Sequence, residues 1–375
     1  MRALAQRLVI PFLLLSPYQA LAQTTTAEST KPQQATLAIP EPYQGGWSVS
    51  GDAAKEEVES KDPESLANTS ARHQLDLIRW QRNTSLARHA GEVPSADQAQ
   101  LETLALDLNT AAPNSFEAHM ANYYMRFPAP SAFQELKEAA EKDGTREELI
   151  GPRLVDAART GEQIALVSCA KDMKARGRIA PALYQVAQDL LASVEPGSVL
   201  FAAGEMDAYP LWVEQYANGR SRDVLVVDAR LLADNGYRAR IWALAKARGP
   251  VPAESGFIAA LGTASTRPVQ LSLALGTKVL APLKDRLFVT GVALRLSNAP
   301  FDNLLLLEER WEKLKKPLNA GPFSQNYLVP GSVLLAHYRA VGDESRASRM
   351  EHELRRMAEQ LGATGNLLRS GVLSH

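Results

Sequence analysis

Residues 198–219 read SVLFAAGEMDAYPLWVEQYANG, and this stretch decides the fold of the middle of the chain. An apolar run from Ser198 to Ala203 stops at Gly204, and the acids Glu205 and Asp207 follow. Continuous apolar runs of this length are typical of strands that are covered on both faces, as in a parallel sheet. We therefore predict a buried strand that ends at Gly204 and leads into a helix.

Further strand-like segments follow downstream. They are DVLVV at 223–227, the alternating VQLSLAL at 269–275 and the longest run, LFVTGVALRL at 287–296. Segments of helix length, residues 208–219 and 236–250, separate the first strands. Strands that alternate with helices predict a small α/β domain with right-handed crossovers, here over residues 195–300.

The chain on either side of this domain has helical periodicity. Within 67–194 and 301–363, apolar residues recur at steps of three and four, and Gly or Pro separates the short segments. Residues 364–375 are interpreted as a tail. In residues 333–362, six positions resemble the pattern of a tetratricopeptide repeat: Leu335, Ala336, Tyr338, Gly342, Asp343 and Ala347. The expected fold class is α/β plus all-α, a small parallel-sheet α/β domain flanked by tetratricopeptide-like helical hairpins.

The first residues predict export. MRALAQRLVIPFLLLSPYQALAQ carries Arg2 and Arg7 before an apolar run and ends in an Ala-x-Ala pattern, so residues 1–22 are interpreted as a signal peptide that is cleaved before Gln23. A periplasmic or secreted protein is the expected product. No later stretch reaches the roughly 20 apolar residues of a membrane span, so none is expected after cleavage. Residues 23–66 are poor in large apolar side chains, which predicts a disordered linker.

Composition argues against several classes of function. A formal net charge of −1 gives no general attraction to nucleic acid or to an anionic membrane surface. Cys169 is the only cysteine and the six histidines form no recognisable metal-binding pattern, so no metal or other cofactor is expected. No Gly-x-Ser-x-Gly motif of hydrolases occurs. Asp228 ends the second strand, where dinucleotide folds hold a ribose, but no glycine follows Gly204 until Gly219, so this hypothesis is set aside.

The acids after Gly204 allow two interpretations. Ligands of α/β sheets bind at the loops that follow the carboxyl ends of the strands, which is where these acids lie. An acid beside the first turn of a helix also caps it, worth ~1 kcal/mol, and Pro210 suits a first turn because its missing N–H has no partner there. The capping role explains Asp207 without any function.

The region from Ser198 to Tyr237 resembles the soluble portion of a family of uncharacterised or glycosyltransferase-like membrane proteins. Their hallmark reads approximately Gly-Asp-Asn-Asp-Thr-Phe-Pro-Leu-Trp, followed by an Asp-Val and a Leu-Leu segment. The matching residues are Leu200, Phe201, Gly204, Asp207, Pro210, Leu211, Trp212, Gln215, Asp223, Val224, Leu231, Leu232 and Tyr237. The resemblance implies a role for Asp207 beyond capping, because a cap alone does not require Gly204, Pro210 and Trp212 around it.

This sequence also departs from the hallmark. Glu205 replaces its first acid, Met206 replaces Asn and Ala208 replaces Thr. The membrane-spanning half, in which sugar transfer takes place in the glycosyltransferase-like members, has no counterpart here. The resemblance therefore implies an exported accessory protein more than a transferase.

Two functional hypotheses follow, and whether the chain is an enzyme stays open. The first, which the sequence favours, is an exported, non-catalytic scaffold that binds a protein or glycan partner in the cell envelope. The second is an enzyme acting on a sugar or cell-envelope substrate, with Glu205 and Asp207 as acid and base whose mutual repulsion separates their pKa values. A scaffold whose α/β domain binds nothing is a third alternative. The candidate site residues are Gly204, Glu205, Asp207, Pro210, Trp212, Gln215 and Asp228.

Overall fold

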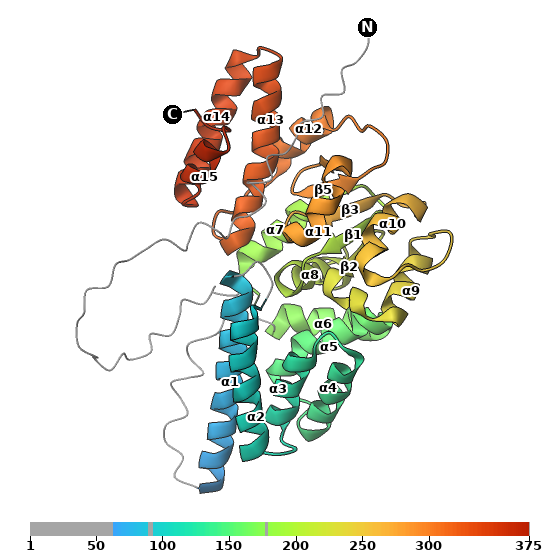
Figure 1. The fold of residues 1–375 in the computed structure, drawn as a ribbon, viewed down its shortest axis with the longest axis vertical. Helices are drawn as coiled ribbons and strands as arrows, with labels where there is room; N and C mark the ends of the chain where they lie inside the picture. The colour runs from blue at the N-terminus through green and yellow to red at the C-terminus, as the bar shows by residue number, and fades with distance from the viewer. Residues whose placement is uncertain (1–62, 89–92, 177–178, 375) are drawn as a thin grey trace, which may run out of the picture.

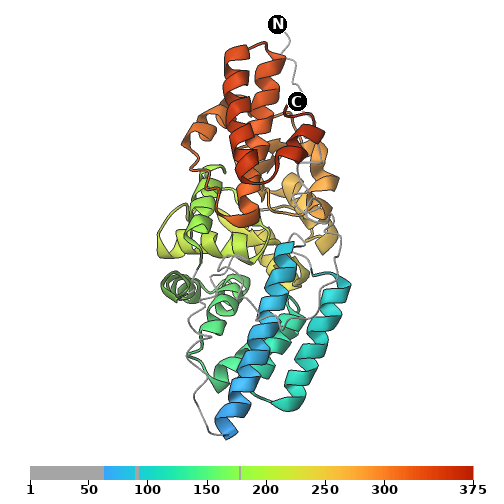
Figure 2. The same ribbon diagram turned by 90° about the vertical axis from the view of Figure 1, so that its left-hand side faces the viewer.

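The computed structural model describes residues 63–88, 93–176 and 179–374. N-terminal helices form one end of an elongated molecule, C-terminal helices form the other, and the sheet lies between them (Figures 1 and 2). The predicted signal peptide and most of the predicted linker lie outside the described residues, but a helix already begins at Pro63. No helix of the described part is both long and apolar enough to cross a membrane.

The predicted fold class, α/β plus all-α, is confirmed. The strands are β1 (Val199–Ala202), β2 (Leu225–Asp228), β3 (Val269–Ser272), β4 (Leu287–Val289) and β5 (Ala293–Leu296). They form one sheet in the order β2-β1-β3-β5-β4. The strands β2, β1 and β3 are parallel, with Val199 opposite both Leu225 and Val269.

The sheet is mixed, which corrects the prediction of a parallel sheet. Residues 287–296 are not one long strand but two antiparallel strands, β4 and β5, and β5 also pairs antiparallel with β3. The chain turns at Gly291, which has a φ of +118°, a conformation that side chains disfavour. A Cβ at Gly291 would lie 2.2 Å from the hydroxyl oxygen of Ser193, so both the turn and the close approach require glycine.

The N-terminal region is a series of antiparallel helices. They are α1 (Pro63–Arg88), α2 (Ser95–Ala111), α3 (Phe116–Arg126), α4 (Pro130–Lys142), α5 (Ile150–Thr160), α6 (Gln163–Arg176) and α7 (Pro181–Ala192). Ser115 caps α3 by accepting the N–H of Ala118. Figure 1 shows α5 and α6 between α4 and the sheet, so the helical region and the α/β unit share an extensive boundary.

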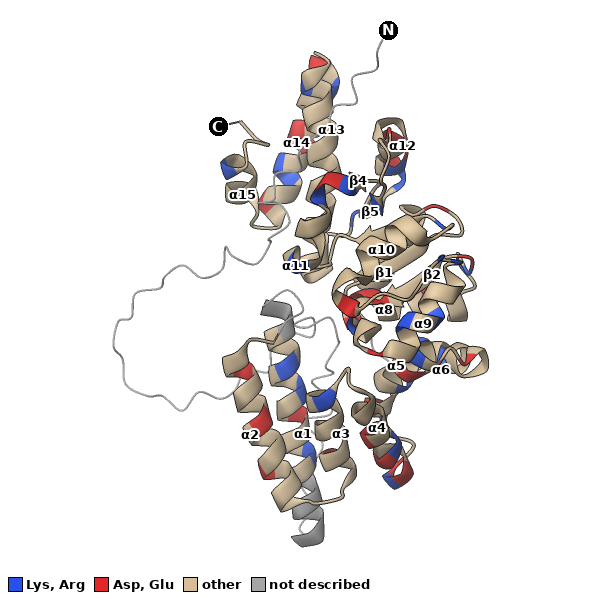
Figure 3. Cartoon of the chain, turned by 45° about the vertical axis from the view of Figure 1, so that its right-hand side comes forward, with Lys and Arg blue, Asp and Glu red and all other residues tan. Residues whose placement is uncertain are grey.

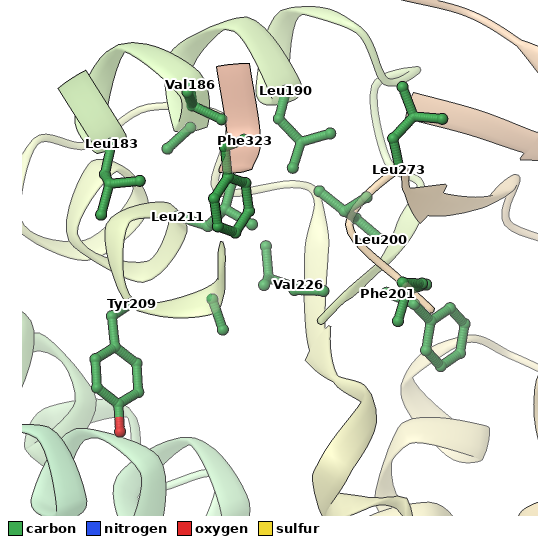
Figure 4. Packing of buried hydrophobic residues seen from close by; sticks show 14 of the residues in the cluster. Leu183, Val186, Leu190, Leu200, Phe201, Tyr209, Leu211, Val226, Leu273 and Phe323 are labelled. Atoms are coloured by element: carbon green, nitrogen blue, oxygen red, sulfur yellow. The ribbon is translucent and has the colours of Figure 1, made fainter. Parts of the chain in front are cut away.

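The α/β unit adds short helices around the sheet. They are α8 (Glu205–Trp212) with a π-helical continuation (Val213–Ala217), α9 (Asn235–Leu244), α10 (Phe257–Ala264) and α11 (Thr277–Leu280). The side chains of α7, β1, β2 and α8 pack together: Leu183, Val186, Leu190, Leu200, Leu211 and Val226 are all buried in one core (Figure 4).

The C-terminal region packs on the far side of α7. It contains α12 (Leu304–Lys313), α13 (Leu328–Ala340), α14 (Glu344–Gln360) and α15 (Thr364–Arg369). The helices α13 and α14 form an antiparallel hairpin, in which a Cβ at Gly331 would lie 2.7 Å from Leu354. The expected tail from residue 364 contains α15 instead, because Leu367 and Leu373 are buried against this hairpin.

Candidate functional site

The chain after β1 lies where α/β sheets bind ligands. Because β1 has β2 on one side and β3 on the other, the direction of chain progression reverses at β1. Ligands of open α/β sheets bind at such a reversal, beyond the carboxyl ends of the strands. Residues 203–207 and Ser272, the last residue of β3, occupy this position.

Gly204 lets an arginine approach this loop. Its φ is +129°, and a Cβ built on it would lie 3.1 Å from Nε of Arg230. Any side chain at position 204 would therefore be strained and would press on the guanidinium of Arg230. The glycine of the motif is explained by this contact rather than by a phosphate.

Glu205 lies between two arginines that come from distant parts of the chain. Its Oε1 accepts hydrogen bonds from Nη2 of Arg82 on α1, at 3.2 Å, and from Nη1 of Arg230, at 3.1 Å. Burial acts to raise the pKa of Glu205, but the charges and hydrogen bonds of the two arginines outweigh it and lower the pKa to about 2. Glu205 is therefore an ionised structural partner at neutral pH.

Asp207 has the opposite environment. Its side chain is almost entirely buried, Oδ2 accepts the N–H of Ala203 at 2.8 Å, and the hydroxyl of Ser272 also bonds to the carboxylate. Burial, with a smaller contribution from the charge of Asp228, raises the pKa of Asp207 to about 6, although both hydrogen bonds oppose the shift. Asp207 thus connects the carboxyl ends of β1 and β3, at the position where the chain progression reverses.

Asp228 ends β2 as predicted and is fully buried. Its carboxylate accepts hydrogen bonds from Nη2 of the Arg230 side chain, at 2.7 Å, and from Nε of the same side chain. It also accepts the backbone N–H of Arg230, at 3.0 Å. Arg230 therefore bridges Asp228 and Glu205. We call Arg82, Glu205, Asp207, Asp228 and Arg230 the carboxyl-edge cluster.

Aromatic rings of α3 and of the loop after it cover this cluster. The guanidinium carbon of Arg230 lies 4.8 Å from the ring centroid of Phe127, and that of Arg82 lies 5.3 Å from the ring centroid of Tyr124. Stacking of this kind adds cation–π attraction to the ion pairs. The cluster therefore holds the N-terminal helices on the carboxyl edge of the sheet.

The helix that follows the loop begins differently from the prediction. Gly204 is the N-cap, and Asp207 is the third residue of α8, from which its carboxylate reaches back to the N–H of Ala203. Asp207 therefore does satisfy a backbone N–H beside the start of the helix. Pro210 is not in the first turn but inside α8, where it leaves the carbonyl of Met206 without its usual N–H donor, and the helix widens into a π-turn three residues later.

Two candidate site residues lie elsewhere. Trp212 is buried and stacks on Tyr209, with the ring centroids 6.1 Å apart. Gln215 lies in the π-helical segment, and its Nε2 donates to the carbonyls of Ser221 and Val224 before β2. Of the candidates, Gly204, Glu205, Asp207 and Asp228 come together, whereas Pro210, Trp212 and Gln215 shape the helix and the loop that follow.

Sequence reasoning missed three partners at this edge: Arg82, Arg230 and Ser272. Arg230 gave one usable signal, since it lies two residues after the acid that ends a predicted strand. Ser272 lies within a predicted strand but had no distinguishing pattern. Arg82 is 123 residues from Glu205 in the chain, and nothing in its helix separates it from other surface cations.

Asp207 predicts a pH dependence of stability. Its pKa is about 6 in the folded chain and 3.8 in an ordinary environment, so stability from this group is fully present below pH 3.8 and is lost as the pH rises to about 6. Between pH 4 and pH 7, the unfolding free energy of Asp207→Asn should therefore rise by about 2 kcal/mol relative to that of the wild type, because only the wild type loses this stability. Urea unfolding at both pH values measures this, and a difference that does not vary with pH would contradict the prediction.

The comparisons with known proteins concern the middle of the chain. Residues 183–255 match the family model described as TMEM260-associated domain 2. That range runs from within α7 to beyond α9 and contains Gly204 and the whole of α8. Searches of curated proteins and of solved structures give no match. The family match fits the link to an uncharacterised family that the sequence predicts, while the tetratricopeptide-like character of the helices stays a prediction.

Metal ligands do not gather in the described residues. Within that part of the chain, no group of three or more His, Cys, Asp or Glu side chains is placed to hold a metal ion. Cys169 is half-buried on α6, and burial raises the pKa of its thiol.

Proposed function

We propose that this chain is an exported, non-catalytic protein whose helices and α/β unit form a scaffold for a protein or glycan partner in the cell envelope. One observation carries the proposal. The buried charges at the carboxyl edge engage one another, since Glu205 and Asp228 both pair with Arg230. Their charges are used to attach the N-terminal helices to the sheet, which suits a rigid binding surface.

The arrangement of the chain fits the same function. Residues 183–255, which match TMEM260-associated domain 2, lie between two helical regions. The long helical regions on both sides of this module offer extended surfaces of the kind that helical scaffolds use for binding.

A binding experiment tests this function. The full chain, immobilised, is presented with cell-envelope extract and, separately, with defined envelope glycans. We expect one protein or one glycan to be retained in stoichiometric amount. Adding the same protein in solution should reduce this retention, because it competes for the partner. Retention of neither class of partner would remove the basis of the proposal.

An enzymatic function is the second candidate, and a specific observation favours it. The pKa values of Glu205 and Asp207 are separated, at about 2 and about 6, and such separation is a property of acid and base pairs in enzymes. The substrate class would be a sugar or another cell-envelope component.

Two substitutions separate the candidates. Glu205→Gln and Asp207→Asn are assayed by mass spectrometry for products released from envelope polysaccharide, with Glu117→Gln as the control, because Glu117 pairs with Arg146 away from the carboxyl edge. An enzyme would lose product formation in one of the two site variants and retain it in the control. A wild-type chain that releases no product rejects the enzymatic candidate.

Export makes its own prediction. Expression of the full chain in a bacterium with a general secretion pathway should yield a mature protein whose first residue is Gln23, because the Ala-x-Ala pattern precedes it. Intact-mass measurement of the periplasmic fraction checks this. A mass that retains residues 1–22 would contradict cleavage at this site.

A further inference from the structure

At the amino edge of the sheet, opposite the carboxyl-edge cluster, the side chain of Arg267 holds several segments of the chain together. This side chain donates to the carbonyls of Gly197, Ser198 and Asp223 at the starts of β1 and β2, and to the carbonyl of Leu244 at the end of α9. The loops before β2 and after α9 are therefore neighbours in space. Both loops reach the surface, and the one after α9 runs along the outside of the molecule (Figure 1).

These two loops carry exposed cations. Arg220 and Arg222 lie on the first, and Lys246 and Arg248 lie on the second. Within the described residues, Lys246 and Arg248 form no ion pair, and Arg222 donates only to the carbonyls of Gln215 and Tyr216. Arg220 pairs with Glu214, but its side chain is 60% exposed. Figure 3 shows further cations on the neighbouring α9, but the side chains of Arg238 and Arg240 are half-buried and donate to the carbonyls of Leu232 and Ala158.

Acids at this edge are fewer. The exposed acids of the two loops are Asp223 and Glu254, and the carboxylate of Asp223 accepts the N–H of Gly197. A chain with a net charge of −1 thus presents a locally positive edge. Because charges beyond about 8–10 Å are screened at physiological salt, a partner at this edge responds to the local cations rather than to the total charge.

Exposed apolar side chains lie on the same part of the chain as these cations. Leu244 is 43% exposed and Val251 is 42% exposed, although α9 and α10 bury most of their other large apolar side chains. Pro250 is exposed between Arg248 and Val251. Apolar tips beside Lys and Arg are the combination that binds the interface of an anionic bilayer, with the apolar groups inserted and the cations at the head groups.

We propose that this amino-edge surface, formed by Arg220, Arg222, Leu244, Lys246, Arg248 and Val251, docks the protein on an anionic lipid bilayer. An acidic polymer would use the cations alone, whereas a bilayer also uses Leu244 and Val251, so the exposed apolar pair favours lipid. The inference is independent of the proposed function, because it concerns the opposite edge of the sheet and requires no partner at Glu205 or Asp207.

Vesicle co-sedimentation of the full chain tests the proposal. We expect binding to vesicles of phosphatidylglycerol and phosphatidylcholine, much weaker binding to phosphatidylcholine alone, and weakening with added salt. A cation at such a surface strengthens binding about fivefold, so the double variant K246E/R248E should bind at least about 25-fold more weakly. The matched control K137E/K142E, on exposed positions of α4, should bind like the wild type.

A second pair of variants separates lipid from an acidic polymer. L244S/V251S should weaken vesicle binding, whereas L106S/I164S, which changes apolar residues that are exposed elsewhere, should not. Polygalacturonate is the competing probe. Binding to this polymer that exceeds vesicle binding and is unaffected by L244S/V251S would overturn the lipid assignment, as would equal vesicle binding by K246E/R248E and the wild type. All four variants alter exposed side chains, so thermal melting confirms that they fold.

Discussion

Arg230→Ala should lower the free energy of unfolding by about 3–5 kcal/mol, the range observed when one partner of a buried ion pair is removed. The substitution leaves Asp228, which is fully buried, without its guanidinium partner and leaves Glu205 with Arg82 alone. It also removes the ring contact with Phe127. Urea unfolding at pH 7 measures the loss.

An exposed arginine provides the matched control. Arg346 also pairs with two acids, Asp343 and Glu308, but its side chain is 47% exposed. Arg346→Ala should therefore lower stability by only about 0–1 kcal/mol. Equal losses in the two variants would show that the carboxyl-edge cluster contributes no more than a surface ion pair.

Asp189→Ala, near the C-terminal end of α7, should lower the free energy of unfolding by a similar amount. The buried carboxylate of Asp189 accepts the N–H groups of Lys315 and Lys316 and the hydroxyl of Tyr327. Its removal leaves three donors without their acceptor, each costing ~1–3 kcal/mol, so a total loss of at least about 3 kcal/mol is expected. Thermal and urea unfolding of the full chain measure it.

Tyr327→Phe tests the same contact with a smaller change. It removes one of the three donors and leaves the carboxylate with two, so the expected loss is about 1 kcal/mol. If Asp189→Ala destabilised the chain no more than Tyr327→Phe does, the carboxylate would not be the contact that holds the C-terminal region to α7.

Local pattern was sufficient to predict the strand and loop at the centre of the molecule. The apolar run at 199–202 is buried along its whole length, and the break at Gly204 marks the start of α8. Both features depend on residues that are adjacent in the chain. The same holds for Asp228, whose position at the end of β2 follows from the length of the run before it.

Features that depend on distant contacts were not predictable in the same way. The run at 287–296 has the composition of one strand, and only the packing of Gly291 against Ser193, almost 100 residues earlier, makes it a hairpin. Pro210 was assigned to a first turn because Asp207 resembled a cap, whereas Gly204 takes that position in the structure. The partners of Glu205 come from α1 and from the chain after β2, and pairing at that separation leaves no periodic signal.

The contact between Gly204 and Arg230 has an evolutionary consequence. A side chain at position 204 would collide with the guanidinium, and the φ of +129° disfavours a side chain there whatever residue occupies position 230. Position 204 should therefore stay glycine among relatives even where position 230 varies. Glu205 and Arg82, in contrast, should covary, because a chain that loses the acid gains nothing from keeping a buried cation opposite it.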